Sequence, residues 1–205
     1  LPPPRMTSLS QLRVAVWPDE AIAPVDASVS GRIAEVADRL AGLGATVSDT
    51  ARPAVDPARY LQTYQTLLFA VMGGSEPLTH PAWSQLDGVR TSFRVAWHEF
   101  FRDWDVVLCP MMATAAFPHD HRPMEERTLP INGEARPYFD QIFWAALATL
   151  CYLPATVFPT GPSAGGLPIG LQAIGPAFED RTTIELARLL GRELGGYRPP
   201  PGYGA

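Results

Sequence analysis

The sequence predicts an α/β fold, and three observations carry that prediction. The chain has 205 residues, of which 46% are apolar and 18% are charged, so it can bury a core of its own. Near its start, a short apolar strand, a helical pattern and a second short strand follow one another, which is the order of a parallel crossover unit. Further along, helical periodicity alternates with short apolar runs that are typical of buried strands.

The expected crossover unit occupies the first part of the chain. Residues 12–17 (Leu-Arg-Val-Ala-Val-Trp) form a short β-branched run that predicts a strand. Asp26 or Ser28 can cap the following helix, whose apolar residues recur at helical spacing until Gly44 ends it. Residues 45–48 then predict the second strand.

Two longer helices and a buried strand are expected next. One helix begins after Asp56 and extends to Gly73, and another extends from about Gly88 to Trp104, because apolar residues recur three and four apart in both. The run Asp105–Cys109 predicts a buried strand that Pro110 ends, and Asn132-Gly133 predicts the turn of a hairpin. The remaining expected elements are a helix over 140–151, strands over 155–158 and 169–174, and a closing helix over 180–194.

The domain organisation follows from the first residues. The chain opens on Leu1-Pro-Pro-Pro-Arg5 without a methionine, which indicates the end of a linker and predicts that further polypeptide precedes it. We therefore expect a Pro-rich linker over 1–11 and one α/β domain over 12–205.

All sixteen basic residues are arginine, and the sequence contains no lysine. A lysine Schiff base, the lysine of a phosphate-binding P-loop and a lysine general base are therefore excluded within this chain. The net charge of −5 is spread without a long run of one sign, so we expect no nucleic-acid partner.

Two cysteines and no signal peptide favour a reducing, cytoplasmic location over a disulfide framework. His119, Asp120 and His121 could contribute to a metal site, but without matched distal ligands we interpret them as a solvated loop, and we expect no metal or cofactor. The stretch 141–178 carries no charge, yet its prolines and glycines interrupt it, so it predicts buried core and no membrane span.

Two nucleophiles are weak candidates. Ser163 lies in Gly161-Pro-Ser-Ala-Gly165, which fits G-x-S-x-G, but a strand and not a helix is expected after it, so we interpret it as a connection between strands. Cys109 closes an apolar strand and is interpreted as core, as is Cys151 within an apolar helix. Three aromatic side chains that flank the uncharged stretch could line an apolar ligand pocket, although core packing is the alternative for each: Tyr138, Phe143 and Trp144.

The order of segments resembles the C-terminal region of amidase signature enzymes. The residues that carry the resemblance are the strand and proline at 105–110, Leu-Pro-Ala-Thr-Val-Phe-Pro at 153–159, Gly-Leu-Pro-Ile-Gly-Leu-Gln-Ala-Ile-Gly at 166–175, and Phe-Glu-Asp at 178–180 before the last helix. The first strand at 12–17 and the tail at 196–202 are also similar to that family.

The resemblance implies a mixed β-sheet flanked by helices and hydrolysis of carboxamides through a serine acyl-enzyme. The family uses a serine nucleophile, a second serine, a lysine base and a Gly/Ser-rich oxyanion loop. This sequence has no lysine and no Gly-Gly-Ser-Ser cluster, so no catalytic role can be assigned to any of its residues. We therefore expect the C-terminal part of an amidase whose catalytic N-terminal portion is missing, inactive alone; the alternative is a binding or structural module derived from one.

The same resemblance gives the expected partners and one departure. A small-molecule amide would bind once the missing portion is joined, and by the same resemblance the candidates to line its pocket, with core packing as the alternative, are Met111, Met112, Tyr138, Phe143 and Trp144. An exposed apolar face could pair two copies into a homodimer. Where the family often has Asn and Gly before Leu-Pro-Ala, this chain has Thr149 and Tyr152. We expect the tyrosine to crowd the packing or to reshape the neighbouring pocket.

Overall fold

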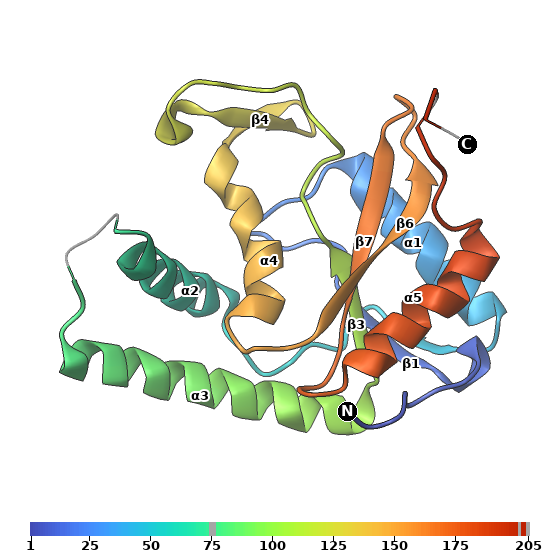
Figure 1. The fold of residues 1–205 in the computed structure, drawn as a ribbon, viewed down its shortest axis with the longest axis horizontal. Helices are drawn as coiled ribbons and strands as arrows, with labels where there is room; N and C mark the ends of the chain where they lie inside the picture. The colour runs from blue at the N-terminus through green and yellow to red at the C-terminus, as the bar shows by residue number, and fades with distance from the viewer. Residues whose placement is uncertain (74–76, 201, 204–205) are drawn as a thin grey trace.

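One mixed sheet of five strands organises the protein in a computed structural model, which describes residues 1–73, 77–200 and 202–203 (Figure 1). The strand order is β2-β1-β3-β7-β6, and a separate hairpin pairs β4 with β5. The strands are β1 Arg13–Val16, β2 Thr46–Ser48, β3 Val106–Pro110, β4 Thr128–Ile131, β5 Glu134–Pro137, β6 Ala155–Pro162 and β7 Pro168–Ile174. β1 runs parallel to β2 and β3, whereas β7 runs antiparallel to β3 and β6, so the expected mixed sheet is confirmed.

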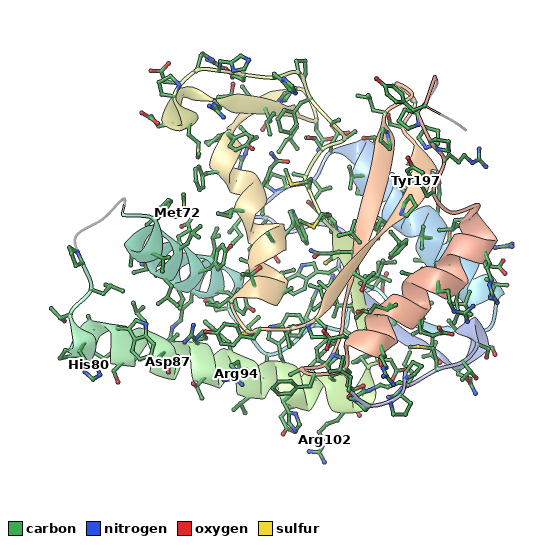
Figure 2. The ribbon with its side chains drawn as sticks, in the orientation of Figure 1. Met72, His80, Asp87, Arg94, Arg102 and Tyr197 are labelled. Carbon is green, nitrogen blue, oxygen red and sulfur yellow. The ribbon has the colours of Figure 1, made fainter. Side chains whose placement is uncertain are left out.

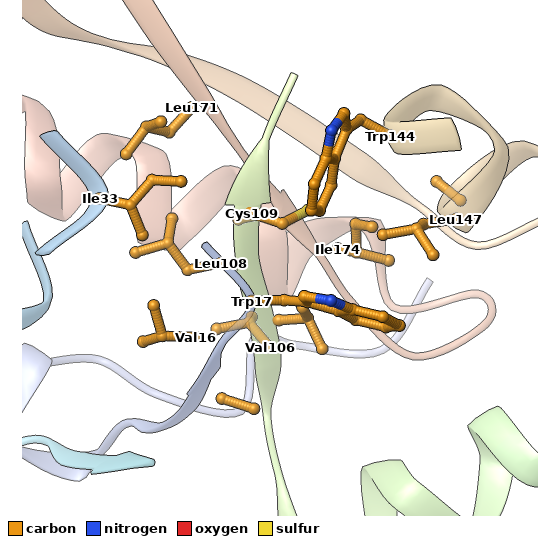
Figure 3. Packing of buried hydrophobic residues seen from close by; sticks show 14 of the residues in the cluster. Val16, Trp17, Ile33, Val106, Leu108, Cys109, Trp144, Leu147, Leu171 and Ile174 are labelled. Carbon is orange, nitrogen blue, oxygen red and sulfur yellow. The ribbon is translucent and has the colours of Figure 1, made fainter. Parts of the chain in front are cut away.

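Helices cover both faces of this sheet. They are α1 Ala27–Gly42, α2 Pro57–Met72, α3 His80–Asp103, α4 Ile142–Thr149 and α5 Asp180–Leu194, with 3-10 turns at Leu9–Gln11, Met124–Glu126 and Tyr138–Gln141. Side chains of β3 alternate between the two faces (Figure 3): Leu108 points toward Ile33 of α1, and Cys109 points toward Trp144 of α4. The sheet is therefore the middle layer, with α1 on one side and α4 on the other.

The predicted crossover unit is confirmed. β1 and β2 pair in parallel with α1 between them, and the Asp26 side chain caps α1 by accepting from the Ser28 amide at 3.0 Å. The helix predicted after Asp56 is confirmed as well. The Asp56 carboxylate caps it by accepting from the Arg59 amide, and Gly73 ends it in the left-handed conformation.

Two helix starts differ from the prediction. α3 begins at His80 and not near Gly88, because Thr79 caps it and Pro81 occupies its first turn. Gly88 lies inside the helix, where the cost of a glycine, about 1 kcal/mol, is offset by the packing of a 24-residue element. The helix expected from residue 140 begins at Ile142, after a 3-10 turn.

The expected hairpin turn is also present and is tied to the crossover unit. Asn132 and Gly133 have φ values of 52° and 84°, as a two-residue turn with both central residues left-handed requires. The Asn132 side chain accepts from the Ala27 amide at 2.8 Å and donates to the Val25 carbonyl oxygen at 3.0 Å. The hairpin is thereby joined to the first turn of α1.

The first residues pack against the domain, although we expected 1–11 to be a linker. Met6 is 1% exposed and Leu9 is 8% exposed. Arg5 makes a bidentate pair with Glu179, with N–O distances of 2.6 and 2.7 Å, and donates to the Phe101 carbonyl oxygen. These contacts hold the stretch to α3 and to the loop before α5.

The uncharged stretch 141–178 forms α4, β6 and β7, and most of α4 and β7 is buried. Within the described residues, no helix is both long enough and apolar enough to cross a membrane.

Candidate functional site

The carboxyl ends of β1 and β3 form the candidate site. These strands are parallel neighbours, so Trp17 and the loop that starts at Met111 leave the sheet at the same edge. In open α/β sheets, ligand crevices lie outside the carboxyl ends of parallel strands. The helix α4 and its preceding turn pack beside this edge, as Figure 3 shows for Trp144.

Trp17 is the centre of the site. Its ring lies edge-on to those of Phe143, with centroids 6.0 Å apart, and Trp144, at 6.5 Å. The Arg52 guanidinium lies 5.0 Å from the Trp17 ring centroid and donates to the Val16 carbonyl oxygen at 2.9 Å. A cation is therefore held directly at the end of β1.

Arg52 has a perturbed environment. Partial burial lowers the pKa of its guanidinium, because desolvation disfavours the charged form. Among the described residues, no carboxylate lies within 4.0 Å of it. Neither Trp17 nor Arg52 was predicted to belong to a site; the available signal was that Trp17 is the last residue of one predicted strand, 12–17, and that Arg52 follows another, 45–48.

Two buried polar side chains at this edge lack hydrogen-bond partners in the described part of the chain. Gln141 is 4% exposed, and neither its amide nitrogen nor its carbonyl oxygen makes a hydrogen bond; the same holds for the Trp144 indole nitrogen, whose residue is 0% exposed. An unsatisfied buried polar group costs about 1–3 kcal/mol, and such groups are rare in complete structures. The start of α4 therefore carries buried polar atoms whose hydrogen bonds are not made within the described residues.

Gln172 provides the contrast within the same layer. Its amide nitrogen donates to the carbonyl oxygens of Pro110 and Trp144, both at 2.8 Å, and the residue is 2% exposed. This amide joins β3, β7 and α4. The Gln172 side chain, whose role is structural, thus has hydrogen-bond partners although it is buried.

The five residues expected to line a pocket occupy three environments. Phe143 and Trp144 are fully buried and pack around Trp17. Met111 and Met112 are half-buried in the loop after β3. Tyr138 begins the turn before α4 and lines a surface cavity that includes none of the other four. The structure thus brings Phe143 and Trp144 together and places Tyr138 apart.

That surface cavity contains the two histidines that were considered as metal ligands. It has a volume of about 540 Å³, and its walls include His119, His121 and Arg127. Asp120 is engaged by Arg122, whose hydrogen bonds lower the pKa of the carboxyl to about 2. No set of three His, Cys, Asp or Glu side chains among the described residues is placed to hold a metal ion.

Neither candidate nucleophile has the environment of one. Ser163 lies in the connection between β6 and β7, where its amide donates to the Leu167 carbonyl oxygen at 2.7 Å, so the expected strand after it is confirmed. Cys109 is 0% exposed, and burial raises the pKa of its thiol far above neutrality. Burial also raises the pKa of Cys151, to about 11.

Tyr152 does not crowd the core, so the first of the two alternatives expected for it is wrong, whereas reshaping of a neighbouring pocket stays a prediction. The residue is 60% exposed, and its ring faces the guanidinium groups of Arg90, at 4.8 Å, and Arg94, at 5.7 Å. Its φ of 58° is a left-handed conformation that suits glycine, and a side chain there costs about 1–2 kcal/mol.

Comparisons with known proteins identify relatives of this chain. A sequence model of the family described as Amidase matches residues 67–184. Over 114 residues, the chain is 37% identical to a glutamyl-tRNA(Gln) amidotransferase subunit of Anaeromyxobacter sp. (strain K), a match that covers 55% of this chain and 21% of that protein. The corresponding subunit of Brevibacillus brevis is 31% identical over 113 residues, again 21% of its length. The matched part thus spans about a fifth of these curated relatives.

Solved structures share the fold. A crystal structure of an amidase superposes with a TM-score of 0.68 at 20% identity and covers 89% of this chain and 46% of the other. The glutamyl-tRNA(Gln) amidotransferase subunit from Thermotoga maritima gives a TM-score of 0.64 at 22% identity, with 97% and 47% covered. This chain therefore has part of the amidase signature fold, because it covers less than half of either larger structure. Because the family model spans more than half of the sequence, this chain belongs to the Amidase family.

Proposed function

We propose that this chain supplies the part of an amide hydrolase that completes the sheet and forms one wall of the substrate pocket. In this proposal, the residues that attack the carboxamide C–N bond belong to a further segment of polypeptide. The substrate is a small carboxamide, and the chain alone does not hydrolyse it. We place the protein in the cytoplasm, which its two unpaired cysteines favour.

The unpartnered Gln141 and Trp144 are the observation that carries the proposal. Trp144 contacts Trp17 at the carboxyl ends of the parallel strands, where α/β folds bind ligands, and the Arg52 guanidinium lies over that Trp17 ring. Gln141 directly precedes α4, which contains Trp144. An amide substrate offers one carbonyl acceptor and N–H donors, which match an indole N–H and a side-chain amide. A neighbouring segment of the fold could satisfy the same atoms, so either occupant completes this edge.

The sequence supports the proposal that the catalytic residues lie outside this chain. Amide hydrolysis needs a nucleophile and a base within hydrogen-bond reach of each other. The chain has no lysine, Cys109 is buried, and Ser163 lies in a turn without a base among its described hydrogen-bond partners. We therefore assign the chain to binding and to completion of the fold.

A surface at one end of α2 and α3 supports a role for a partner. Val71 is 87% exposed, Met72 is 61% exposed and Trp83 is 44% exposed. Large apolar side chains exposed in one region are typical of contact surfaces. We propose that this surface contacts a second copy of the chain, and sedimentation of wild type against Met72→Glu tests it; a monomer for both would contradict the homodimer.

The decisive experiment distinguishes part of an amidase from an independent hydrolase and from a binding or structural module. The 205-residue chain is assayed with aryl and alkyl carboxamides and with a fluorophosphonate probe, and we expect no turnover and no labelling. The coding sequence upstream is then read, and the longer product is expressed and assayed. We expect an in-frame segment with a Ser/Gly-rich loop and a lysine, and amide hydrolysis by the longer chain.

Two outcomes contradict the proposal. Labelling of the 205-residue chain that Ser163→Ala or Cys109→Ala abolishes would assign it as an independent hydrolase. A stop codon and an authentic start directly upstream would favour the alternative, a binding or structural module derived from an amidase.

A further inference from the structure

We propose that a groove along α3 binds a small anionic amphiphile, a carboxylate with a short aromatic or aliphatic tail. The groove lies between one face of α3 and the loops before β6 and α5, near the ends of β3 and β7 opposite to the candidate site. It goes beyond the proposed function and does not depend on it.

The groove has the size of a small-molecule site. Its volume is about 800 Å³, within the range of about 300–1,000 Å³ that is usual for ligand pockets. Six α3 residues line it and recur three and four apart, so they form one face of the helix: Thr91, Arg94, Val95, His98, Phe101 and Arg102. The opposite wall consists of Cys151, Leu153 and residues 176–179.

Apolar side chains at the groove are open to solvent. Val95 is 57% exposed and Phe178 is 75% exposed, although both line the same groove. Leu153 and Pro176 extend this apolar lining. Burial of this apolar surface under a ligand tail would favour binding by about 25 cal/mol for each Å² removed from water.

The groove carries a cation that the described residues leave available. Arg5 is fully engaged by Glu179 and by two carbonyl oxygens, and Arg102 pairs with Glu99 at 2.9 Å. Arg94, which Figure 2 labels on α3, is exposed, and no carboxylate of the described residues lies within 4.0 Å of it. Its guanidinium lies 5.7 Å from the centroid of the Tyr152 ring. In a chain of net charge −5, this cation beside apolar surface selects a ligand carboxylate.

Two aromatic residues at the groove adopt a backbone conformation that costs free energy. Tyr152, whose neighbours Cys151 and Leu153 line the groove, has φ 58°, and Phe178 has φ 66°. Strained residues of this kind concentrate at functional sites. Both rings are largely exposed, so burial in the described structure does not explain why the strain is retained.

Isothermal titration calorimetry on the 205-residue chain tests the proposal with phenylbutyrate, with its neutral analogue phenylbutanol, and with butyrate. We expect saturable binding of phenylbutyrate and at least about tenfold weaker binding of the other two, because one lacks the charge and the other lacks the ring. Arg94→Gln should weaken phenylbutyrate about tenfold and remove the preference over phenylbutanol. Val95→Asp should abolish the binding of both.

Arg59→Gln is the matched control, since Arg59 is an exposed helical arginine outside the groove. It should leave the preference for the acid unchanged. Thermal unfolding of each variant checks that it folds, as expected for exposed positions. Equal binding of acid and alcohol by the wild type, no saturable binding, or a preference that survives Arg94→Gln would overturn the proposal.

Discussion

Two sets of buried polar side chains pack against α4, and they differ in whether their hydrogen bonds are made. Around Tyr60, the hydroxyl donates to the Leu147 carbonyl oxygen at 2.8 Å and accepts from the Trp97 indole nitrogen at 3.1 Å, with Cys151 Sγ also 3.1 Å away. Around Gln141, three buried polar atoms have no partner among the described residues. One set is complete, and the other is not.

The difference shows what each set is for. The Tyr60 set joins α2, α3 and α4 through side chains that are fully buried, so its role is to hold these helices together. The Gln141 set lies near the carboxyl ends of the parallel strands, where its polar atoms are buried without partners among the described residues. A substitution within a complete network should lower the free energy of unfolding, whereas one within an incomplete network should change it little. Stability measurements can therefore separate the two.

The largest effect is expected for Trp97→Ala. The side chain is 0% exposed and stacks on Phe101 with ring centroids 5.4 Å apart, so its removal leaves a cavity and deprives Tyr60 of a donor. We expect a loss of about 3–5 kcal/mol in the free energy of unfolding, measured by urea denaturation. A loss below about 1 kcal/mol would mean that the Tyr60 set does not hold the helices.

Tyr60→Phe should cost less, about 1–3 kcal/mol, because it keeps the ring and leaves the Trp97 indole nitrogen and the Leu147 carbonyl oxygen unpaired. The same denaturation series measures it. Unchanged stability would show that these hydrogen bonds contribute nothing net and would remove the contrast with Gln141.

Alkaline pH should weaken the complete set. Burial raises the pKa of the Cys151 thiol from 9.0 to about 11, so the folded state holds its proton more tightly than the unfolded state does. This contribution to stability is fully present below pH 9 and is lost as the pH rises to about 11; it amounts to about 2–3 kcal/mol. Denaturation at several pH values should show a shallower decline for Cys151→Ala. An identical decline for both proteins would assign the effect to other groups, such as Cys109.

The smallest effect is expected at the incomplete set. Gln141→Leu removes two unpaired polar atoms, so stability should change by less than about 1 kcal/mol or should increase. Gln172→Leu is the control, since it removes the amide that donates to both the Pro110 and the Trp144 carbonyl oxygens and should cost about 1–3 kcal/mol. If Gln141→Leu costs as much as Gln172→Leu, then Gln141 has a structural role and the edge is already complete.

Much of the fold could be predicted because its signals are local. Asp56 before an apolar helical pattern, and Asn132-Gly133 between short strands, specify a cap and a turn through a few neighbouring residues. The start of α3 was missed because Gly88 and Pro81 resemble helix breakers, whereas packing of the whole helix outweighs a glycine and a first-turn proline is favourable.

The candidate site was only partly predicted because it depends on contacts between distant segments. Phe143 and Trp144 were found through their apolar surroundings, but Trp17 and Arg52 reach them from the other end of the chain. Tyr152 was expected, from its place in a family pattern, to crowd the packing or to reshape a neighbouring pocket; its left-handed backbone and exposed ring contradict only the crowding.

The sequence by itself determined the class of fold, the resemblance to amidases and the exclusion of lysine chemistry, since composition and local periodicity do not depend on how the chain closes. The tertiary structure alone decided that Gln172 is satisfied, that Gln141 and Trp144 are not within the described residues, and that Arg94 faces an open groove. Whether a buried polar group has a partner depends on segments that are far apart in the chain, and a local sequence pattern does not predict which of them come together.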